Sequence, residues 1–413
     1  MVKEGHVSLE DLNVEFGYST GPGSLFFYFE EENAFRQEVR EFARDRIAPL
    51  APQIERENNI ELVIKTVKGM GEPGYLGFAF PEELGGGGKG VVYRTIFTEE
   101  LTAASYAVSL VRTGSVALFG IPVLNFGSQE QKEKFLKPVI QGTKIGALGI
   151  TEPTAGSDAV GGMRTRAVKE GDHYIINGEK RYITNGSIAD YILLYTITDP
   201  DVSRRKGMSA FILPTDVPGF EVVKDYELMG RRGTVNSHMR LNNIELPVEN
   251  LIGEEGQGFQ ILLHGLNSER ICTAAQYIGI ARSSFEIAAK YAAERQQFGK
   301  ALREFQGISF RIADMYTNIE ATRLLILRAA RMADAGLSFA KEAAAAKCFA
   351  AEKSTEICDE AMQVLGGAGY IKEYPLEQNY RDIRISRVSA GSTEMLRLTI
   401  QGQIYRELYP RKK

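Results

Sequence analysis

Small and apolar residues recur at three- and four-residue spacing over a long stretch, from about Gly256 to Gln306. This spacing is typical of a helix, because positions three and four residues apart share one helical face. No proline interrupts the stretch, and Phe298-Gly299 supplies a stop signal near its end. The pattern predicts one very long helix, around which we expect the rest of the chain to be organised.

One acidic residue, Glu269, interrupts the small and apolar positions of this predicted helix. It falls on roughly the same face as Gly265, Cys272, Thr273 and Gln276. A carboxylate on an inner helix face is costly unless it is paired or used. Two interpretations stay open from spacing alone: an ion pair with Arg270 or another buried arginine, or a general base in a site of low dielectric constant.

The pattern changes twice along the chain. Before about residue 145 it is helical, with helices predicted at about 30–48, 61–71, 93–120 and 129–138. Between about 145 and 250 it indicates short strands, and Asn177-Gly178 and Asn185-Gly186 predict tight hairpin turns. The predicted strands are His173–Ile176, Lys180–Ile183, Tyr191–Thr198, Ser209–Leu213 and Met239–Leu241. Helices follow again at about 303–335 and 338–364, and a short one begins near Ser392.

This order defines the predicted domains. We expect an N-terminal extension over 1–28, a helical domain over 29–145, a small β-barrel or sandwich over 146–253 and a helical domain over 254–413. The length of 413 residues suits two or three domains. Because no strand leads into the glycine-rich turn at 366–369, the sequence disfavours a Rossmann nucleotide site.

Composition excludes several classes of function. A net charge of −4 and a pI near 5.8 give no electrostatic footprint for nucleic acid. The three cysteines and four histidines are scattered, which predicts neither a disulfide framework nor a metal site. We expect no membrane span, since no apolar run reaches the roughly 18 residues that a span needs. The acidic N-terminus resembles neither a signal nor a transit peptide, so a cytoplasmic protein is expected.

Arg112 is the only charge in the apolar segment SYAVSLVRTGSVALFG. It could reach an acidic partner between helices. Alternatively, it could project into a ligand pocket, where a guanidinium binds a carboxylate bidentately.

Four segments at fitting spacing are similar to segments of one known family. They are Leu148–Asp158 (LGITEPTAGSD), Tyr182–Gly186 (YITNG), Arg295–Lys300 (RQQFGK) with Phe305-Gln306, and Gln363–Tyr370 (QVLGGAGY) with Arg381-Asp382. Over about residues 30–410 the chain thereby resembles the acyl-CoA dehydrogenase family. The resemblance implies an α+β fold with an N-terminal helical domain, a middle β-barrel and a C-terminal four-helix bundle. It also implies FAD as cofactor, an acyl-CoA substrate, an electron-transfer flavoprotein as acceptor and a homotetramer.

The resemblance assigns the FAD contacts residue by residue. Those of the subunit's own site are Leu148, Ile150, Thr151, Gly156, Ser157, Tyr182, Thr184, Ser392 and Glu394. Those contributed by the neighbouring subunit are Arg295, Gln297, Phe298, Gln306, Gln363, Gly366 and Gly367. Tyr182 stands where the family commonly has tryptophan, and this chain contains none, but an aromatic face is kept.

The chain departs from the family at the usual catalytic position. Ala390, in Ser389-Ala390-Gly391, stands where the most common catalytic glutamate would be, and it cannot take a proton. The isovaleryl-CoA and long-chain subfamilies instead place this glutamate on the long helix, directly before an arginine. Glu269-Arg270 matches that arrangement, so the resemblance implies Glu269 as the base and the Ala390 amide as a donor to the thioester oxygen.

The sequence indicates the substrate only in general terms. The small Ser389 leaves room for a branched, cyclic or aromatic acyl group, and Arg112 could select a second carboxylate; Ser157 and Arg270 are the other predicted substrate contacts. Three alternatives stay open: an oxidase using O₂, a flavoenzyme of this fold with an unorthodox base acting on a cyclic substrate, and a non-enzymatic helical interaction protein.

Overall fold

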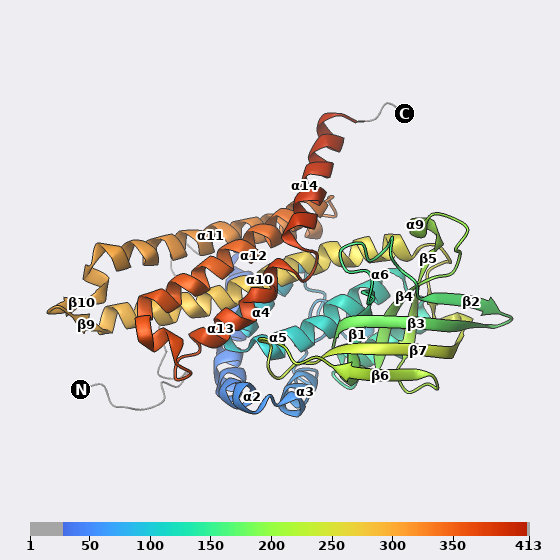
Figure 1. Ribbon diagram of the computed structural model, residues 1–413, viewed down its shortest axis with the longest axis horizontal. Coiled ribbons are helices and arrows are strands. Elements are labelled where there is room, and N and C mark those ends of the chain that lie inside the picture. Colours follow the sequence, from blue (N-terminus) through green and yellow to red (C-terminus); the bar gives the residue numbers. More distant parts are fainter. Residues whose placement is uncertain (1–27, 411–413) are drawn as a thin grey trace.

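A computed structural model describes residues 28–410, in which helices, a sheet and further helices follow one another along the chain (Figure 1). The N-terminal helices are α1 (Glu30–Phe42), α2 (Ala51–Glu57), α3 (Ile60–Gly69), α4 (Val91–Ala104), α5 (Tyr106–Thr113), α6 (Ile121–Phe126), α7 (Gln129–Gln131) and α8 (Lys137–Ile140). Shorter 3-10 and π-helical segments lie between them, among them η5 (Gly114–Gly120).

The middle part is a sheet of eight strands. They are β1 (Gly146–Gly149), β2 (Arg166–Glu170), β3 (His173–Thr184), β4 (Tyr191–Ile197), β5 (Met208–Pro214), β6 (Phe220–Asp225), β7 (Asn236–Pro247) and β8 (Leu251–Ile252). The strand order is β6-β7-β3-β2-β4-β5-β8, with β1 parallel to β4. Apolar side chains of both faces are buried, one face packing within the sheet's own core and the other against the N-terminal helices.

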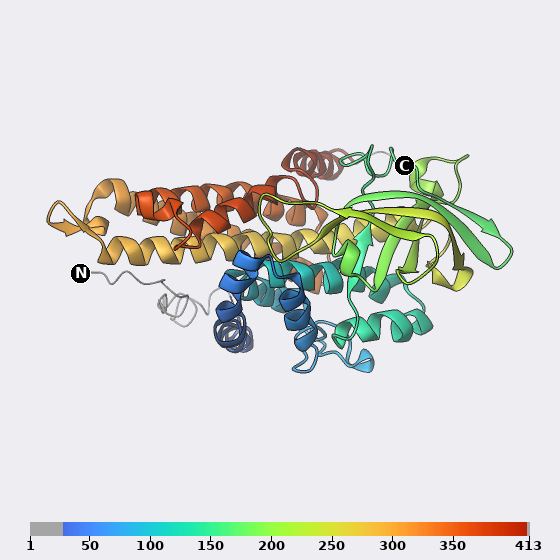
Figure 2. The same cartoon turned by 60° about the horizontal axis from the view of Figure 1, so that its bottom comes forward.

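The C-terminal part is a bundle built on the long helix α10 (Gly258–Glu294). It continues through the small hairpin β9 (Gln296–Gln297) and β10 (Lys300–Ala301), α11 (Gln306–Asp334), α12 (Ala340–Leu365), η10 (Gly366–Tyr370), α13 (Leu376–Ile383), η11 (Arg384–Arg387) and α14 (Thr393–Leu408). The α10 helix runs from the sheet to the far tip of the bundle (Figures 1 and 2). The predicted fold class and the single long helix are confirmed; the helix ends at Glu294, ahead of the Phe298-Gly299 stop signal.

Both predicted hairpin turns are wrong. β3 runs through Asn177-Gly178, where its pairing with β7 shifts register. Gly178 serves close packing there, since an added Cβ would stand 2.4 Å from the Thr165 hydroxyl. Asn185 does start a turn, with φ of 65°, but the chain passes into β4, which pairs with β1, β2 and β5 rather than with β3. A dipeptide signal reports local turning and not which strand becomes the partner.

The prediction that no segment is long and apolar enough to span a membrane is also wrong. Tyr106–Phe126 passes that test by length and composition, because α5, η5 and α6 follow one another without a break. However, 89% of its apolar window is buried inside the protein, as expected for a core helix. The segment packs against β1 and α10, so its apolarity is accounted for by the protein interior.

A buried ion network joins the N-terminal helices to the bundle. Glu99 and Glu100 of α4 are surrounded by Arg36 of α1, Arg282 of α10 and Arg323 of α11. All five side chains are at least nine-tenths buried. Because burial of single charges is costly, this network requires all its members, and it holds α4 against α10.

Candidate active site

Glu269 is a partly accessible residue on α10 with an unpaired carboxylate. Within residues 28–410 it forms no hydrogen bond or ion pair, and the adjacent Arg270 donates instead to Asn267 Oδ1 at 3.1 Å. Burial raises the pKa of Glu269 to about 7, against the lowering effect of Arg270, Lys347 and Arg231. The interpretation of Glu269 as a member of a buried ion pair is therefore wrong. A carboxyl group with such a pKa can exchange protons near neutrality.

The segment after η11 brings a free backbone donor to the same region. Ala390 has a φ of 54° and Gly391 a φ of 89°, so two consecutive residues adopt the left-handed conformation that alanine rarely takes. Within the described chain the Ala390 amide makes no hydrogen bond. A Cβ added to Gly391 would lie 3.8 Å from Arg270 Nη2, which places this segment beside the turn of α10 that carries Glu269.

Two residues that the sequence analysis missed hold this segment in place. Lys347 of α12 is fully buried, and its Nζ donates to the Ser386 carbonyl at 2.9 Å and to the Gly391 carbonyl at 2.7 Å. Tyr277 of α10 is also buried, and its hydroxyl lies 2.7 Å from Ser389 Oγ. Burial lowers the pKa of Lys347 to about 8, against the raising effect of Glu269. The lone charge of Lys347 in the run AAAAKCFAA was the available signal.

The residues expected to hold the flavin ring lie on β1, in the loop that follows it and at the end of β3. Tyr182 is 55% exposed and its ring lies 5.1 Å from that of Tyr226. Lys180, fully buried, pairs with Glu152 at 2.9 Å and donates to the Ile150 carbonyl, which fixes the LGITEP segment against β3. The expected residues in this region are Leu148, Ile150, Thr151, Gly156, Ser157, Tyr182 and Thr184.

This region also leaves room for a group with phosphates. An added Cβ on Gly156 would meet nothing within 4 Å, and Gly156 and Ser157 are exposed. Ser392 caps the first turn of α14, and Glu394 is exposed beside it. Hydrogen bonds from its backbone amide and from the side chains of Ser392 and Thr393 lower the pKa of Glu394. Glu394 therefore remains a carboxylate and is not a proton donor.

The remaining expected FAD residues lie elsewhere. Arg295, Gln297, Phe298, Gln306, Gln363, Gly366 and Gly367 are all exposed, at the tip of the bundle farthest from the sheet (Figures 1 and 2). Phe298 is 93% exposed. Tyr291 and Tyr374 pack edge to face with ring centroids 6.0 Å apart, and they join the end of α10 to the turn between η10 and α13. One chain alone therefore does not bring the two groups of residues together.

Arg112 does not have the expected place. Its Nε and Nη2 both lie 3.2 Å from the Tyr75 carbonyl, and its guanidinium stacks 4.2 Å from the Phe97 ring. It has no acidic partner within residues 28–410, and burial lowers its pKa to about 9. The expectation that Arg112 projects into a pocket as a bidentate carboxylate clamp is wrong, because that edge of the guanidinium is already used.

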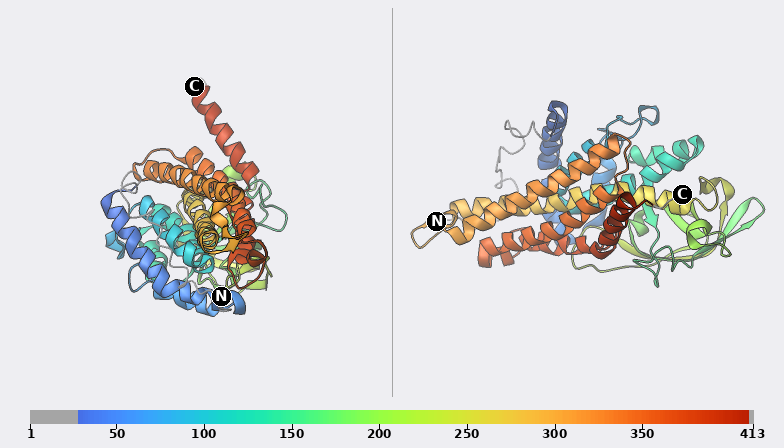
Figure 3. Two further views of the ribbon diagram at one scale, coloured as in Figure 1. Left: turned by 90° about the vertical axis from the view of Figure 1, so that its left-hand side faces the viewer. Right: turned by 90° about the horizontal axis from the view of Figure 1, so that it is seen from above.

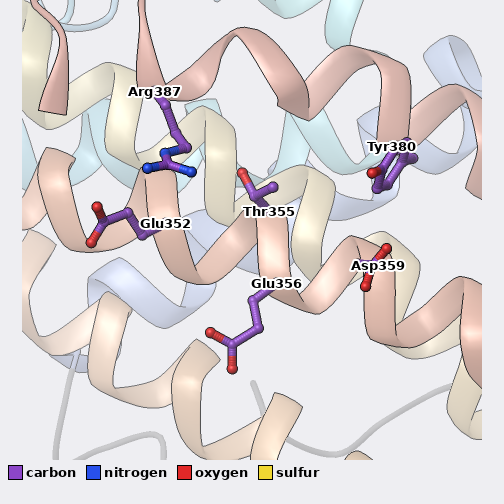
Figure 4. A pocket seen from close by; sticks show the side chains of 6 residues that line it. All are labelled: Glu352, Thr355, Glu356, Asp359, Tyr380 and Arg387. Carbon is purple, nitrogen blue, oxygen red and sulfur yellow. The ribbon is translucent and has the colours of Figure 1, made fainter.

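A surface cavity of about 410 Å³ lies away from these residues. It is lined by Glu352, Thr355, Glu356 and Asp359 of α12, Tyr380 of α13 and Arg387 of η11 (Figure 4). Its three acids oppose the binding of phosphates. Within residues 28–410 no cluster of three histidine, cysteine or acidic side chains is placed to hold a metal ion.

The observed residues fit FAD. The exposed aromatic face of Tyr182 suits a flavin ring, and the open space at Gly156 suits a pyrophosphate. The exposed Arg295 and Phe298 at the tip suit contacts with such groups. The ring would lie near Tyr182 and Thr184, and Ser157 could donate to an anionic group.

Comparison with known proteins identifies the family of this chain. Residues 29–143, 147–244 and 256–405 match the N-terminal, middle and C-terminal domains of acyl-CoA dehydrogenase. The short-chain specific acyl-CoA dehydrogenase of Clostridium acetobutylicum is 40% identical over 376 residues, which cover 91% of this chain and 98% of that protein.

Solved structures are also similar. Butyryl-CoA dehydrogenase from Megasphaera elsdenii has a TM-score of 0.88 at 35% identity, covering 92% of this chain and 99% of that one. An FAD complex of PigA has a TM-score of 0.88 at 29% identity, covering 93% and 99%. The chain thus belongs to the acyl-CoA dehydrogenase family, whose members are FAD-dependent oxidoreductases that act on a CH–CH bond.

Proposed function

We propose that this enzyme forms a 2,3-enoyl-CoA from an acyl-CoA thioester, with Glu269 as the base that removes the α-proton. The observation that carries the proposal is the unpaired carboxylate of Glu269, whose pKa lies at about 7, beside a segment with an unpaired amide at Ala390. A base is most effective when its pKa lies near the operating pH.

Each group has a distinct task. The Ala390 amide donates to the thioester oxygen, where negative charge develops as the α-proton leaves; one such donor contributes about 3 kcal/mol. Glu269 takes the proton, a step for which a positioned base contributes roughly 10²–10⁴-fold. Arg270 and Lys347 favour the negative charge near Glu269 through their own positive charges. Bound FAD supplies the acceptor for the hydride that leaves the β-carbon.

The acyl group that we propose is branched, cyclic or aromatic. Ser389 is small and is held by Tyr277, so it does not swing across the space beside Ala390. Electron transfer to an electron-transfer flavoprotein is the proposed second half-reaction. An oxidase would instead form hydrogen peroxide in step with turnover, which a peroxide assay distinguishes.

We further propose that the chain works as a homotetramer, in which the tip of one subunit completes the FAD site of another. The distance between the two groups of expected FAD residues supports this (Figure 1). The helix α14 projects from the body of the subunit, and it exposes Leu398, Tyr405 and Leu408 (Figure 3). Such an apolar surface is suited to burial against another subunit.

The substitution Glu269→Gln tests the base. We expect the rate of flavin bleaching by acyl-CoA to fall by at least about 100-fold, because the amide cannot accept the proton. Glu286→Gln on the outer side of the same helix is the matched control and should retain bleaching. If Glu269→Gln retains bleaching, Glu269 is not the base, and an unorthodox base acting on a cyclic substrate is favoured. A colourless purified protein would favour the non-enzymatic alternative.

A further inference from the structure

One side of α12 connects the two groups of expected FAD residues. It carries residues that are three or four positions apart and therefore share one helical face: Cys348, Glu352, Thr355, Glu356, Asp359 and Gln363. At the start of this α12 face, Cys348 Sγ lies 3.9 Å from the Thr393 carbonyl, directly before Glu394 of the subunit's own FAD group. At its end, Gln363 belongs to the group at the tip. Thr355 lies about halfway, seven residues after Cys348 and eight before Gln363.

The surface cavity of about 410 Å³ opens at this halfway point, where η11 packs against the α12 face. Two of its three carboxylates already pair with cations of the same subunit at 2.7 Å. The other charged residues that line the cavity, Asp359 and Arg387, are exposed and form no hydrogen bond or ion pair within residues 28–410. The cavity therefore has one unpaired charge of each sign, and the two charges lie on opposite sides of Thr355 (Figure 4).

A two-fold axis through this cavity accounts for both observations. In a two-fold symmetric pair, every contact is made twice, with the roles of the two copies exchanged. If the tip of each subunit completes the FAD site of the other, the axis passes midway between the two groups of FAD residues, which is at Thr355 on the α12 face. Rotation about that axis brings Arg387 of one copy towards Asp359 of the other, because these two residues lie on opposite sides of Thr355 (Figure 4).

We propose that the α12 face and η11 form the surface through which two copies of this chain pair about a two-fold axis, with Arg387 of each copy bound to Asp359 of the other. The surface is complementary to itself in charge, since α12 supplies carboxylates and η11 exposes both Arg384 and Arg387. Val388, next to Arg387, is 57% exposed and adds apolar area to this surface. The position of the axis rests on the proposed sharing of FAD between subunits, whereas the complementary charges do not depend on it.

Charge reversal in the full-length, FAD-loaded protein tests this pairing. Arg387→Glu places like charges opposite each other at two positions in every symmetric pair, and Asp359→Arg does the same with the opposite sign. Each single variant should raise the dissociation constant of the pair by about 10- to 100-fold, as measured by analytical ultracentrifugation. Lys65→Glu is the matched control, since Lys65 is an exposed cation of α3 that does not line the cavity. It should leave the dissociation constant unchanged.

The two single variants should also select each other when they are co-expressed. A pair of one Arg387→Glu chain and one Asp359→Arg chain has opposite charges at both contacts, so every oligomer should hold the two variants in equal numbers. Native mass spectrometry with one variant tagged measures this composition, and tagged with untagged wild type gives the reference for random assembly.

Random assembly of the two variants, or an unchanged dissociation constant in both of them, would overturn the pairing. If the wild type still formed oligomers in that case, the sharing of FAD would stand and use another face. A monomeric wild type with a full complement of FAD would overturn the pairing and the shared FAD site together. The role of Glu269 is tested separately by Glu269→Gln.

Discussion

The ammonium group of Lys347 lies 2.7 Å from the Gly391 carbonyl and 2.9 Å from that of Ser386, on either side of Ala390 in the chain. One buried cation on α12 therefore fixes both ends of the segment that presents the Ala390 amide. It also holds Ala390 in a left-handed conformation that costs on the order of 1–3 kcal/mol when it is not supported by its surroundings.

Replacing Lys347 by glutamine should affect both the rate and its pH dependence. The loss of two charge-assisted hydrogen bonds frees the segment around Ala390, and we expect kcat to fall more than KM changes. Removal of the positive charge should also raise the pKa of Glu269 above about 7, because Lys347 lowers it. The acid limb of the pH–kcat profile should thus move to higher pH, as measured by flavin bleaching from pH 5 to 9.

Lys341→Gln serves as the control for this prediction. Lys341 is on the same helix but pairs with Glu342 and with Glu407 of α14. Its loss should leave the acid limb in place. A Lys347→Gln enzyme with an unshifted acid limb would show that the role of Lys347 is confined to stability.

We expect the ionised carboxylate of Glu269 to destabilise the folded protein above neutral pH. Its pKa is raised from 4.5 to about 7 on folding, so the native state retains a proton that the unfolded chain releases. Stability is therefore lost as the pH rises from about 4.5 through 7. Glu269→Gln removes this loss and should stabilise the protein by on the order of 1–3 kcal/mol at pH 8. Urea unfolding at pH 5 and pH 8 checks this: an equal effect at both values contradicts it.

Glu100 should have the opposite effect on stability. Burial alone would raise its pKa, but Arg282, Arg40 and Arg36 hold the pKa of Glu100 well below its usual range. Glu100→Gln leaves buried guanidinium groups without their partner, and we expect a loss of about 3–5 kcal/mol at pH 7. Urea unfolding measures the loss. Arg397→Gln, which breaks an exposed pair with Glu352, should cost less than about 1 kcal/mol and gives the matched comparison.

The features that the sequence predicted correctly are those that depend on a local pattern of residues. The spacing of small residues specified α10, and the odd position of Glu269 within it singled out the carboxylate that the structure leaves unpaired. The sheet was less predictable, because Asn177-Gly178 serves a close approach to Thr165 inside one strand instead of a turn between two. Pairing partners of strands depend on contacts that are distant along the chain, which a local pattern does not contain.

Polar contacts between helices were the other feature that the sequence did not predict. Arg112 is a lone charge in an apolar run and was expected to meet an acid or a ligand, but its partner is the Tyr75 carbonyl. Lys347 gives the same kind of signal in α12, and its partners are carbonyls as well. A lone buried cation therefore indicated a specific polar contact in both cases. Which contact it makes was fixed only by the packing of helices far apart in sequence.

The proposed sharing of the FAD site between subunits predicts complementation between two defective variants. Gly156→Val should block the approach of a pyrophosphate without straining the fold, because an added Cβ there meets nothing within 4 Å. Arg295→Glu should repel the same group from the exposed tip of the bundle. Each variant alone should purify with little FAD. Co-expression should restore about a quarter of the sites, since random pairing makes half of the pairs mixed and each mixed pair has one intact site. The ratio of flavin to protein absorbance measures the recovery, with size-exclusion chromatography confirming that the oligomer is kept. If both residues instead acted within one subunit, every mixed pair would carry a defect in each site and no FAD would return.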